Sequence, residues 1–285
     1  MKKAGLSAAA LMCGVMAFAQ NTSTITQGTA GELSTNNQAT VSQVGSNSAQ
    51  INQTNQGNSS NSYQTGAGNT IEVGQRGMES RSFINQDGSE NEVRVKQNRS
   101  GNQNNLSVVS QVGEDHEAAI TQDGVDGQAF VAQSGSLNYA NVIQYPNNPG
   151  EGNDAYVVQF GNGEDPNSAR IKQEDQENFA SILQWGNGNI ALTDQTGDKN
   201  ISWQSQFGNG NNVVTTQRDN NGSGHGVGEN FSVTNQFGDA NTIAHTQSGQ
   251  NNYAGSFQAG NGHNSSVSQN GAANSTTVIQ SGNFN

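Results

Sequence analysis

A short segment recurs along most of this chain at an interval of eleven residues. In the copy that begins at Asn178, the residues two, four, six and eight places later are alanine, isoleucine, glutamine and glycine. The copies that begin at Asn189 and Asn200 keep the same order of Asn, a small residue, a larger residue, Gln and Gly. A fixed internal period of this kind indicates a stack of similar structural units.

The spacing inside each unit predicts a β-strand followed by a turn. Residues two apart project from the same side of an extended strand, so the Asn, the small residue, the larger one and the Gln share one face. The glycine and the two residues after it favour a tight turn, because glycine adopts positive φ without a steric penalty. A single strand cannot cover its own apolar side, and eleven residues are too few for a helical hairpin. Neighbouring units must therefore stack, which predicts a β-solenoid.

About 22 units follow one another, and a Gln stands six residues after the start of each. The first unit, at Asn21, is weak, whereas the pattern is regular from Asn37 to the last unit, at Asn274. The small inward place is mostly Ala, and the larger place is mostly Val or Ile. The predicted fold is therefore all-β: a solenoid of about 22 eleven-residue strand-turn units, with two strands per coil and two facing sheets around a thin core.

Inward Asn and Gln side chains of such a stack would lie above identical residues in the next coil. Their amides can then hydrogen-bond along the stack, as in the amide ladders of cross-β assemblies. We predict ladder positions at Asn178, Gln184, Asn189, Gln195, Asn200, Gln206, Asn241 and Gln247. Turn glycines are predicted at Gly186, Gly197 and Gly208. In five units another residue takes the glycine place: Asn55, Arg99, Pro146, Asp175 and Asp219.

The beginning of the chain differs from the repeats and is typical of a signal peptide. Two lysines precede an apolar run that is shorter than a bilayer-spanning helix requires. We predict residues 1–19 as the signal peptide, residues 20–36 as a flexible leader with a weak first repeat, and residues 37–285 as the repeat array. The only cysteine, Cys13, lies in the first segment, so we expect no disulfide in the exported chain.

Acidic residues outnumber basic ones in the array as a whole. Without residues 1–19, nine basic residues remain against 23 acidic ones, a net charge of −14. Nucleic acid is a poor partner for that charge. We also expect no membrane insertion, because the repeats contain no apolar run of about 20 residues.

The spacing Gln-x-Gly-x-x-Asn-x-Ala-x-x-x-Gln, which runs from Gln184 to Gln195, resembles the curlin repeat of curli, the functional amyloid fibres of bacterial biofilms. The resemblance covers nearly all of the array. It implies a secreted, cell-surface fibre subunit that is exported through a dedicated outer-membrane pore and polymerises with copies of itself. It also implies a chaperone and a nucleator as partners, and no cofactor. The array is about twice as long as that of the familiar major subunit, so the resemblance leaves the major or nucleator role open.

The outward residues of alternate units differ in character. One series carries aromatic side chains, and we predict a lateral apolar face at Phe160, Trp185, Trp203, Phe207 and Phe237. The other series is mostly charged or polar. An apolar stripe several coils long exceeds what a soluble monomer normally exposes. We expect it to contact another solenoid or a flanking loop such as residues 145–152.

No arrangement of residues predicts catalysis, so we expect no enzyme activity. The four histidines show no metal-ligand spacing, and the acidic residues are scattered through turns without a paired cleft. The alternatives to a fibre subunit are a monomeric adhesin and an ice-binding rod. An ice-binding rod would need a flat outward array of Thr, and only two short runs, from Thr22 and from Thr242, resemble one. A fibre subunit needs open ends, which the complete last unit at Asn274 favours.

Overall fold

The computed structural model describes residues 20–28, 35–97, 104–145, 152–219 and 228–283. The signal peptide predicted for residues 1–19 lies outside the described residues. So do most of three longer joints between units, at residues 98–103, 146–151 and 220–227. The replaced turn residues Arg99 and Pro146 fall in these joints, so the structure does not bear on them.

The described chain is all-β, as the repeat spacing predicts. It forms 20 strands and no helix within these residues. The strands are β1 (Thr22–Gln27), β2 (Gln38–Gln53), β3 (Ser59–Gln75), β4 (Arg81–Ser89), β5 (Glu92–Gln97), β6 (Leu106–Glu114), β7 (Glu117–Gln122), β8 (Gln128–Ser136), β9 (Tyr139–Tyr145), β10 (Asp154–Gly161), β11 (Ser168–Glu174), β12 (Phe179–Trp185), β13 (Ile190–Thr196), β14 (Ile201–Phe207), β15 (Asn212–Arg218), β16 (Phe231–Phe237), β17 (Thr242–Gln250), β18 (Tyr253–Asn261), β19 (Asn264–Ala272) and β20 (Ser275–Asn283).

Two of the strands are twice the usual length, and this accounts for the difference between 20 strands and about 22 units. β2 and β3 each run through two repeat units without a break. The register between them shifts at Ser46–Ser48, where the chain passes from one sheet to the other. Glycines with positive φ, Gly45 and Gly66, lie next to this corner. The chain bends there within one continuous strand.

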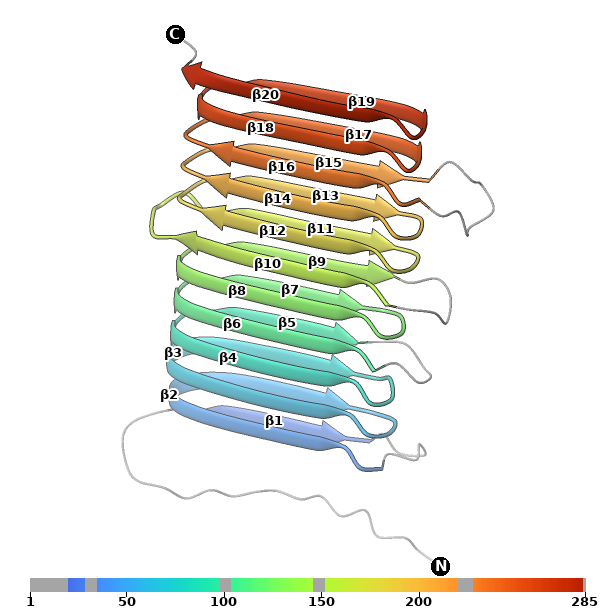
Figure 1. The fold of residues 1–285 in the computed structure, drawn as a ribbon. Helices are drawn as coiled ribbons and strands as arrows, with labels where there is room; N and C mark the ends of the chain where they lie inside the picture. The colour runs from blue at the N-terminus through green and yellow to red at the C-terminus, as the bar shows by residue number, and fades with distance from the viewer. Residues whose placement is uncertain (1–19, 29–34, 98–103, 146–151, 220–227, 284–285) are drawn as a thin grey trace, which may run out of the picture.

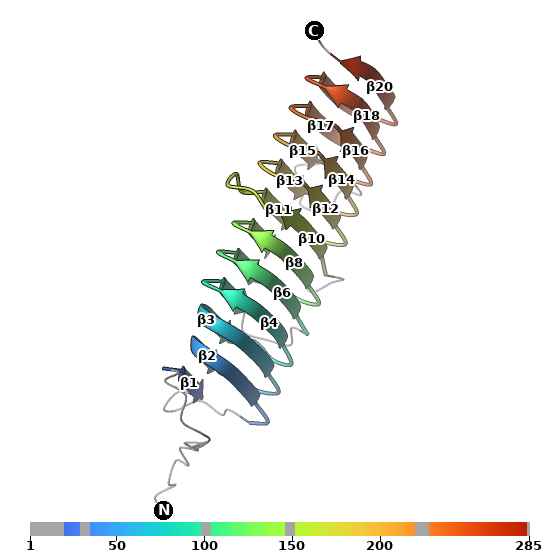
Figure 2. The same ribbon diagram turned by 90° about the vertical axis from the view of Figure 1, so that its left-hand side faces the viewer.

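The strands form a parallel solenoid in which each unit pairs with the unit two places along the chain. Thus β12 pairs with β10 and β14, while β13 pairs with β11 and β15. We call the sheet of β4 and the later even-numbered strands, with the first halves of β2 and β3, the even sheet. The odd sheet holds β1, the second halves of β2 and β3, and the odd-numbered strands from β5 onwards. With two units per coil, the 22 units make about eleven coils. Figure 1 shows the coils stacked from the first strand to the last, and Figure 2 shows the two series of strands side by side.

The core lies between the two sheets and consists of the inward small and large residues. Ala180 and Ile182 of β12 are at most 1% exposed, and equivalent Ala, Val and Ile residues are buried from β2 to β13. Each fully buried Val or Ile stabilises the fold by about 1.5–3 kcal/mol relative to its exposed state. A row of such residues along the axis therefore holds the two sheets together.

The large inward place becomes polar in the C-terminal third, which differs from the expected Val and Ile row. Six consecutive units carry a buried polar residue there: Thr193, Gln204, Thr215, Thr234, His245 and Ser256. Hydrogen bonds between facing sheets replace aliphatic packing. Ser232 Oγ lies 2.8 Å from His245 Nδ1, and Ser256 Oγ lies 2.7 Å from His245 Nε2. These coils contain much less buried apolar surface than the coils before them.

Candidate functional site: amide ladders, stack ends and an aromatic face

The inward Gln side chains form a continuous ladder in each sheet. Gln184 is fully buried, its Nε2 donates to Oε1 of Gln206 at 2.9 Å, and its own Oε1 accepts from Nε2 of Gln159 at 2.8 Å. The same link joins every neighbouring pair of Gln residues in the even sheet from Gln43 to Gln280. It also joins every pair in the odd sheet from Gln27 to Gln269, through Gln195 and Gln247.

The Gln amides also connect the two sheets. Nε2 of Gln184, in the even sheet, lies 3.0 Å from the carbonyl oxygen of Ser168 and 2.9 Å from that of Asn189, both on the odd-sheet side. Each buried amide therefore has partners within its own column and across the core. Buried polar groups are tolerated when they are fully hydrogen-bonded, so the ladder provides specificity without disulfides.

The Asn residues at the start of each unit form a second kind of column. The backbone N–H and Nδ2 of Asn200 both donate to Oδ1 of Asn178, at 3.0 and 3.1 Å. The Nδ2 of Asn178 also donates to the carbonyl oxygen of Gly197 at 2.7 Å. Asn189 and Asn241 make the equivalent contacts in the odd sheet. Within these columns, each Asn side chain donates to the Asn of the N-terminal coil, whereas each Gln side chain donates to the Gln of the C-terminal coil.

Histidine replaces Asn at two places in the odd-sheet column. The backbone N–H of His116 donates to Asn91 Oδ1 at 3.1 Å, and the N–H of His263 donates to Asn241 Oδ1 at 3.0 Å. Burial lowers the pKa of His116, which favours the neutral ring that can accept a hydrogen bond from Asn138. Both rings therefore occupy places in that column, and the His116 ring continues it to Asn138. The third described histidine, His245, lies in the core, and His225 lies outside the described residues.

The predicted turn glycines adopt the conformation that only glycine tolerates easily. Gly186, Gly197 and Gly208 have φ values of +112°, +97° and +119°. A Cβ at Gly208 would overlap the backbone carbonyl oxygen of Gly238 in the next coil. Asn55 and Asp175, which stand in the glycine place of their units, have φ near +70°, a region that Asn and Asp adopt more readily than other residues.

Both ends of the stack have open strand edges among the described residues. β1 and the first half of β2 have a strand partner on one side only, and so do β19 and β20. At these ends no neighbouring coil covers the inward residues, and Ile25 is 45% exposed. The two ends match in the even sheet, because Asn, Val and Gln occupy the same places at both ends. These residues are Asn37, Val41 and Gln43 at one end and Asn274, Val278 and Gln280 at the other.

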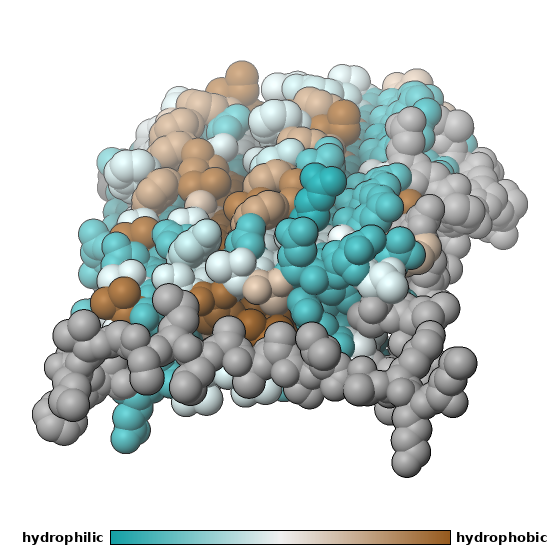
Figure 3. Space-filling view, turned by 90° about the horizontal axis from the view of Figure 1, so that it is seen from below, coloured by the Kyte–Doolittle hydropathy of each residue, from teal (hydrophilic) through white to brown (hydrophobic). Residues whose placement is uncertain are grey.

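The outward side of the even sheet carries a continuous group of aromatic residues from β8 to β18, which we call the aromatic face. It includes Phe160, Trp185, Trp203, Phe207 and Phe237, of which Trp185 is the most exposed at 57% and Phe207 is half-buried. Further members are Phe130, Tyr156, Phe179, Phe231, Tyr253 and Phe257. The Phe207 and Phe237 rings stack with centroids 5.1 Å apart and planes 2° apart. In Figure 3, hydrophobic and hydrophilic residues gather in different parts of the surface.

The outward side of the odd sheet carries charged residues on most strands from β3 to β15. Arg94 pairs with Glu72 at 3.0 Å and with Glu92 at 2.9 Å, and these contacts raise its pKa. Further along the same face, Lys172 contacts Glu174 at 2.8 Å. Such exposed pairs contribute little to stability. They identify the odd sheet as the solvated face of the solenoid.

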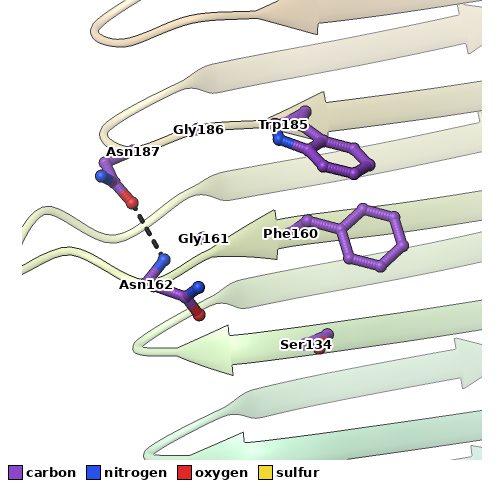
Figure 4. A pocket seen from close by; sticks show the side chains of 7 residues that line it. All are labelled: Ser134, Phe160, Gly161, Asn162, Trp185, Gly186 and Asn187. Carbon is purple, nitrogen blue, oxygen red and sulfur yellow. Dashed lines mark hydrogen bonds between the residues drawn. The ribbon is translucent and has the colours of Figure 1, made fainter.

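A hollow of about 300 Å3 lies at the edge of the aromatic face. It is lined by Ser134, Phe160, Gly161, Asn162, Trp185, Gly186 and Asn187. Figure 4 shows the Phe160 and Trp185 rings one above the other, 5.0 Å apart between centroids, with Ser134 below them. Because Ser134 is small, the lower side of Phe160 is open. The polar contact drawn there joins the backbone N–H of Asn162 to Oδ1 of Asn187 at 3.1 Å.

The remaining polar groups offer no arrangement for catalysis in the described part of the chain. No group of three or more His, Cys, Asp or Glu residues there is placed to bind a metal. The described ranges also hold no helix long and apolar enough to cross a membrane. The Ser232–His245–Ser256 chain is fully enclosed in the core, so it cannot reach a substrate. Sequence reasoning missed this polar segment, although the break in the Val and Ile row at Thr193 would have revealed it.

The comparison with protein families identifies the repeat. Residues 88–124 and 238–271 match the model of the curlin associated repeat. The chain contains curlin repeats. The two matches lie in different parts of the stack, one within β4 to β7 and one around β17 to β19, and the same inward Asn and Gln columns run through both. The comparison with curated proteins found no match.

Proposed function

We propose that this chain is the structural subunit of an extracellular, curli-like amyloid fibre that grows by end-to-end addition of whole solenoids. The proposal is supported by the curlin repeats, the parallel solenoid and the open edges at both ends of the described stack. Growth needs no chemical reaction. Each addition forms main-chain hydrogen bonds between strand edges, extends the amide columns and covers the exposed apolar residues.

The observation that carries the proposal is the match between the two ends. Placing β20 of one copy against the first half of β2 in the next sets Asn274 over Asn37 and Gln280 over Gln43. In the odd sheet, Gln269 of β19 similarly falls over Gln27 of β1. The joint would therefore repeat the contacts that exist between coils inside one chain. We expect it to have a similar free energy per coil.

The test places a charge in this joint and compares it with a charge on the outside of the same strand. Val278 projects inward at the end of the stack, while its neighbour Thr277 projects outward. In the joint, a lysine at position 278 would be buried without a partner, which costs several kcal/mol. We expect Val278→Lys to slow seeded elongation more than tenfold, measured by thioflavin fluorescence and electron microscopy. Thr277→Lys should elongate like the unmodified chain.

Two outcomes would contradict this function. Equal elongation rates for the two lysine variants would show that the joint does not form at this end. A folded chain that stays monomeric even with seeds would favour the rod-like adhesin. Neither Thr run favours the ice-binding alternative: Thr22 and Thr24 lie beside Ser48 and Gln50, and Thr242 lies between Asn212 and Asn264 of the neighbouring strands.

We further propose the cellular setting that this function requires. Residues 1–19 have the features of a secretion signal, and the net negative charge argues against nucleic acid as a partner. The partners would be other copies of the chain, a curli-type outer-membrane pore, a chaperone and a nucleator. Pulling down the tagged chain from the periplasm and outer membrane tests these partners. Recovery of the chain only in the cytoplasm would contradict the proposal.

A further inference from the structure

The coils with a polar interior carry the C-terminal part of the aromatic face. From β13 to β18 the large inward residues are polar, as at Gln204 and Thr234, whereas the outward residues of β14 and β16 include Trp203, Phe207 and Phe237. The apolar surface of this segment is therefore mainly on the outside of the even sheet. Contiguous apolar surface of this extent on a folded chain marks an interaction site.

The packing of the rings indicates what kind of partner fits the aromatic face. Phe130 stacks on Tyr156 at 4.9 Å, and Phe231 stacks on Tyr253 at 5.7 Å, with planes within 8° in both pairs. Each ring thus covers part of the face of its neighbour in the next coil. A sugar ring or a flat aromatic ligand would need free ring faces along the stack. The ridged surface of side-chain edges instead suits interdigitation with another side-chain surface, as in packed β-sheets.

The charges favour a second copy of this chain as that partner. Across the seven even strands from β8 to β20 the only charged residue is Asp154, and burial raises its pKa. As a whole, residues 20–285 are strongly acidic, with a net charge of −14. Two identical acidic chains repel each other wherever charged surfaces approach within about 8 Å in physiological salt. The aromatic face is the broad side on which they can approach closely with little repulsion.

The size of the face is sufficient for a stable contact. The six even strands from β8 to β18, spaced ~4.8 Å apart and each presenting ~7 residues at ~3.3 Å, cover roughly 670 Å2. Each partner in a stable protein–protein interface contributes about 600–1,000 Å2. Further copies added at the ends would extend the face along the whole fibre. The area per fibre then grows with length, so even a weak contact between single chains becomes strong between fibres.

We infer that two solenoids pair through their aromatic faces, so that the proposed fibre consists of two stacks with their charged odd sheets outward. This inference rests on the proposed fibre function. Trp185, Trp203 and Phe237, which are exposed in the single chain, would lie in the contact between the stacks. Pairing would give the coils with a polar interior a second apolar layer.

The test counts chains per unit length of fibre. One chain of about eleven coils extends a single stack by ~50 Å, so scanning transmission electron microscopy distinguishes one chain from two in that length. For residues 20–285, which include every described residue, we expect two chains. The triple variant Trp185→Ser, Phe207→Ser and Phe237→Ser should form fibres with one. The control triple variant, Ile190→Ser, Leu192→Ser and Val214→Ser on the odd sheet, should keep two.

Each outcome decides the inference. One chain per unit length in the unmodified fibre, or two in the aromatic triple variant, would overturn the pairing while leaving the fibre function intact. Unmodified fibres that are single and gain mass only when a soluble glucan is added would overturn it in favour of a carbohydrate partner. If no chain forms fibres, the fibre function fails as well. Circular dichroism of the soluble chains checks folding, and the single variant Phe207→Lys repeats the test if the triple variant does not fold.

Discussion

Replacing Gln residues in a ladder should lower the free energy of unfolding by an amount that depends little on how many neighbouring Gln residues are replaced. Replacing Gln184 with Leu leaves two buried groups without their ladder partners, the Nε2–H of Gln159 and the Oε1 of Gln206. Each such group costs about 1–3 kcal/mol. Burial of the leucine offsets part of this, because it is close in volume to the glutamine. We expect a net loss of about 3 kcal/mol.

Replacing the next Gln of the same ladder as well should lower the free energy of unfolding only slightly further. In the double variant Gln184→Leu with Gln206→Leu, the two groups left without ladder partners are those of Gln159 and Gln236. The number of groups left without ladder partners is unchanged, and the second replacement removes only the additional contact from Gln206 to the carbonyl oxygen of Ile190. The double variant should therefore lie within about 1 kcal/mol of the single variant. Gln128 points outward and is exposed in β8. Gln128→Leu is therefore the control and should change the free energy of unfolding by less than about 0.5 kcal/mol.

The two tryptophans of the chain provide a local measurement of these changes. Trp185 and Trp203 lie in β12 and β14, the strands that carry the two altered Gln residues. Urea unfolding would be followed by their fluorescence at a chain concentration too low for fibres to form. A double variant that loses twice as much stability as the single variant would refute the ladder as a cooperative column. Equal stability of Gln184→Leu and Gln128→Leu would refute its contribution altogether.

Two further predictions concern the turns and the buried histidine. Gly208→Ala should lower the free energy of unfolding by more than about 3 kcal/mol, because the added Cβ would overlap the carbonyl oxygen of Gly238. Gly210 has a φ of +63° and open space around it, so Gly210→Ala should lower the free energy of unfolding by only about 1–2 kcal/mol. Thermal unfolding measures both. Burial lowers the pKa of His245 to about 4, below the value of about 6.5 in the unfolded chain. As the pH falls, His245 therefore binds a proton in the unfolded chain before it does so in the folded chain. His245 does not affect the free energy of unfolding above pH 6.5, and between pH 6.5 and 4 its protonation should lower that free energy by about 3 kcal/mol. His245→Val should remove this part of the pH dependence of the urea midpoint; an unchanged dependence would contradict the assignment.

The repeat spacing was sufficient to predict the strands, their alternation between two sheets and their stacking. These features depend on local rules: the period of two along a strand, and glycine at positive φ in the turn. The side on which Gln184 or Trp203 points follows from its place in the unit. The resemblance to curlin repeats, read from the segment Gln184 to Gln195, agrees with the family match elsewhere in the chain.

Other features depend on contacts between units and could not be read from the spacing. Nothing in the sequence distinguishes the corner inside β2 from an ordinary turn, because Gly45 occupies the same place as Gly186. The opposite donor directions of Asn178 and Gln184 arise from how each side chain meets the coil above and below. Likewise, His245 is acceptable in the core only because Ser232 and Ser256 face it.

The opposed directions of the Asn and Gln columns would make the two tips of the proposed fibre chemically different. At the tip formed by β20, Gln280 presents an amide hydrogen and Asn274 an amide oxygen. At the tip formed by β1 and β2, no described residue donates to the Oε1 of Gln43. Each tip is complementary to the opposite tip and not to a second copy of itself. A single stack therefore has a direction, with two chemically different ends. Arriving chains therefore meet different surfaces at the two tips, and a fluorescently labelled seed should lengthen at unequal rates in its two directions.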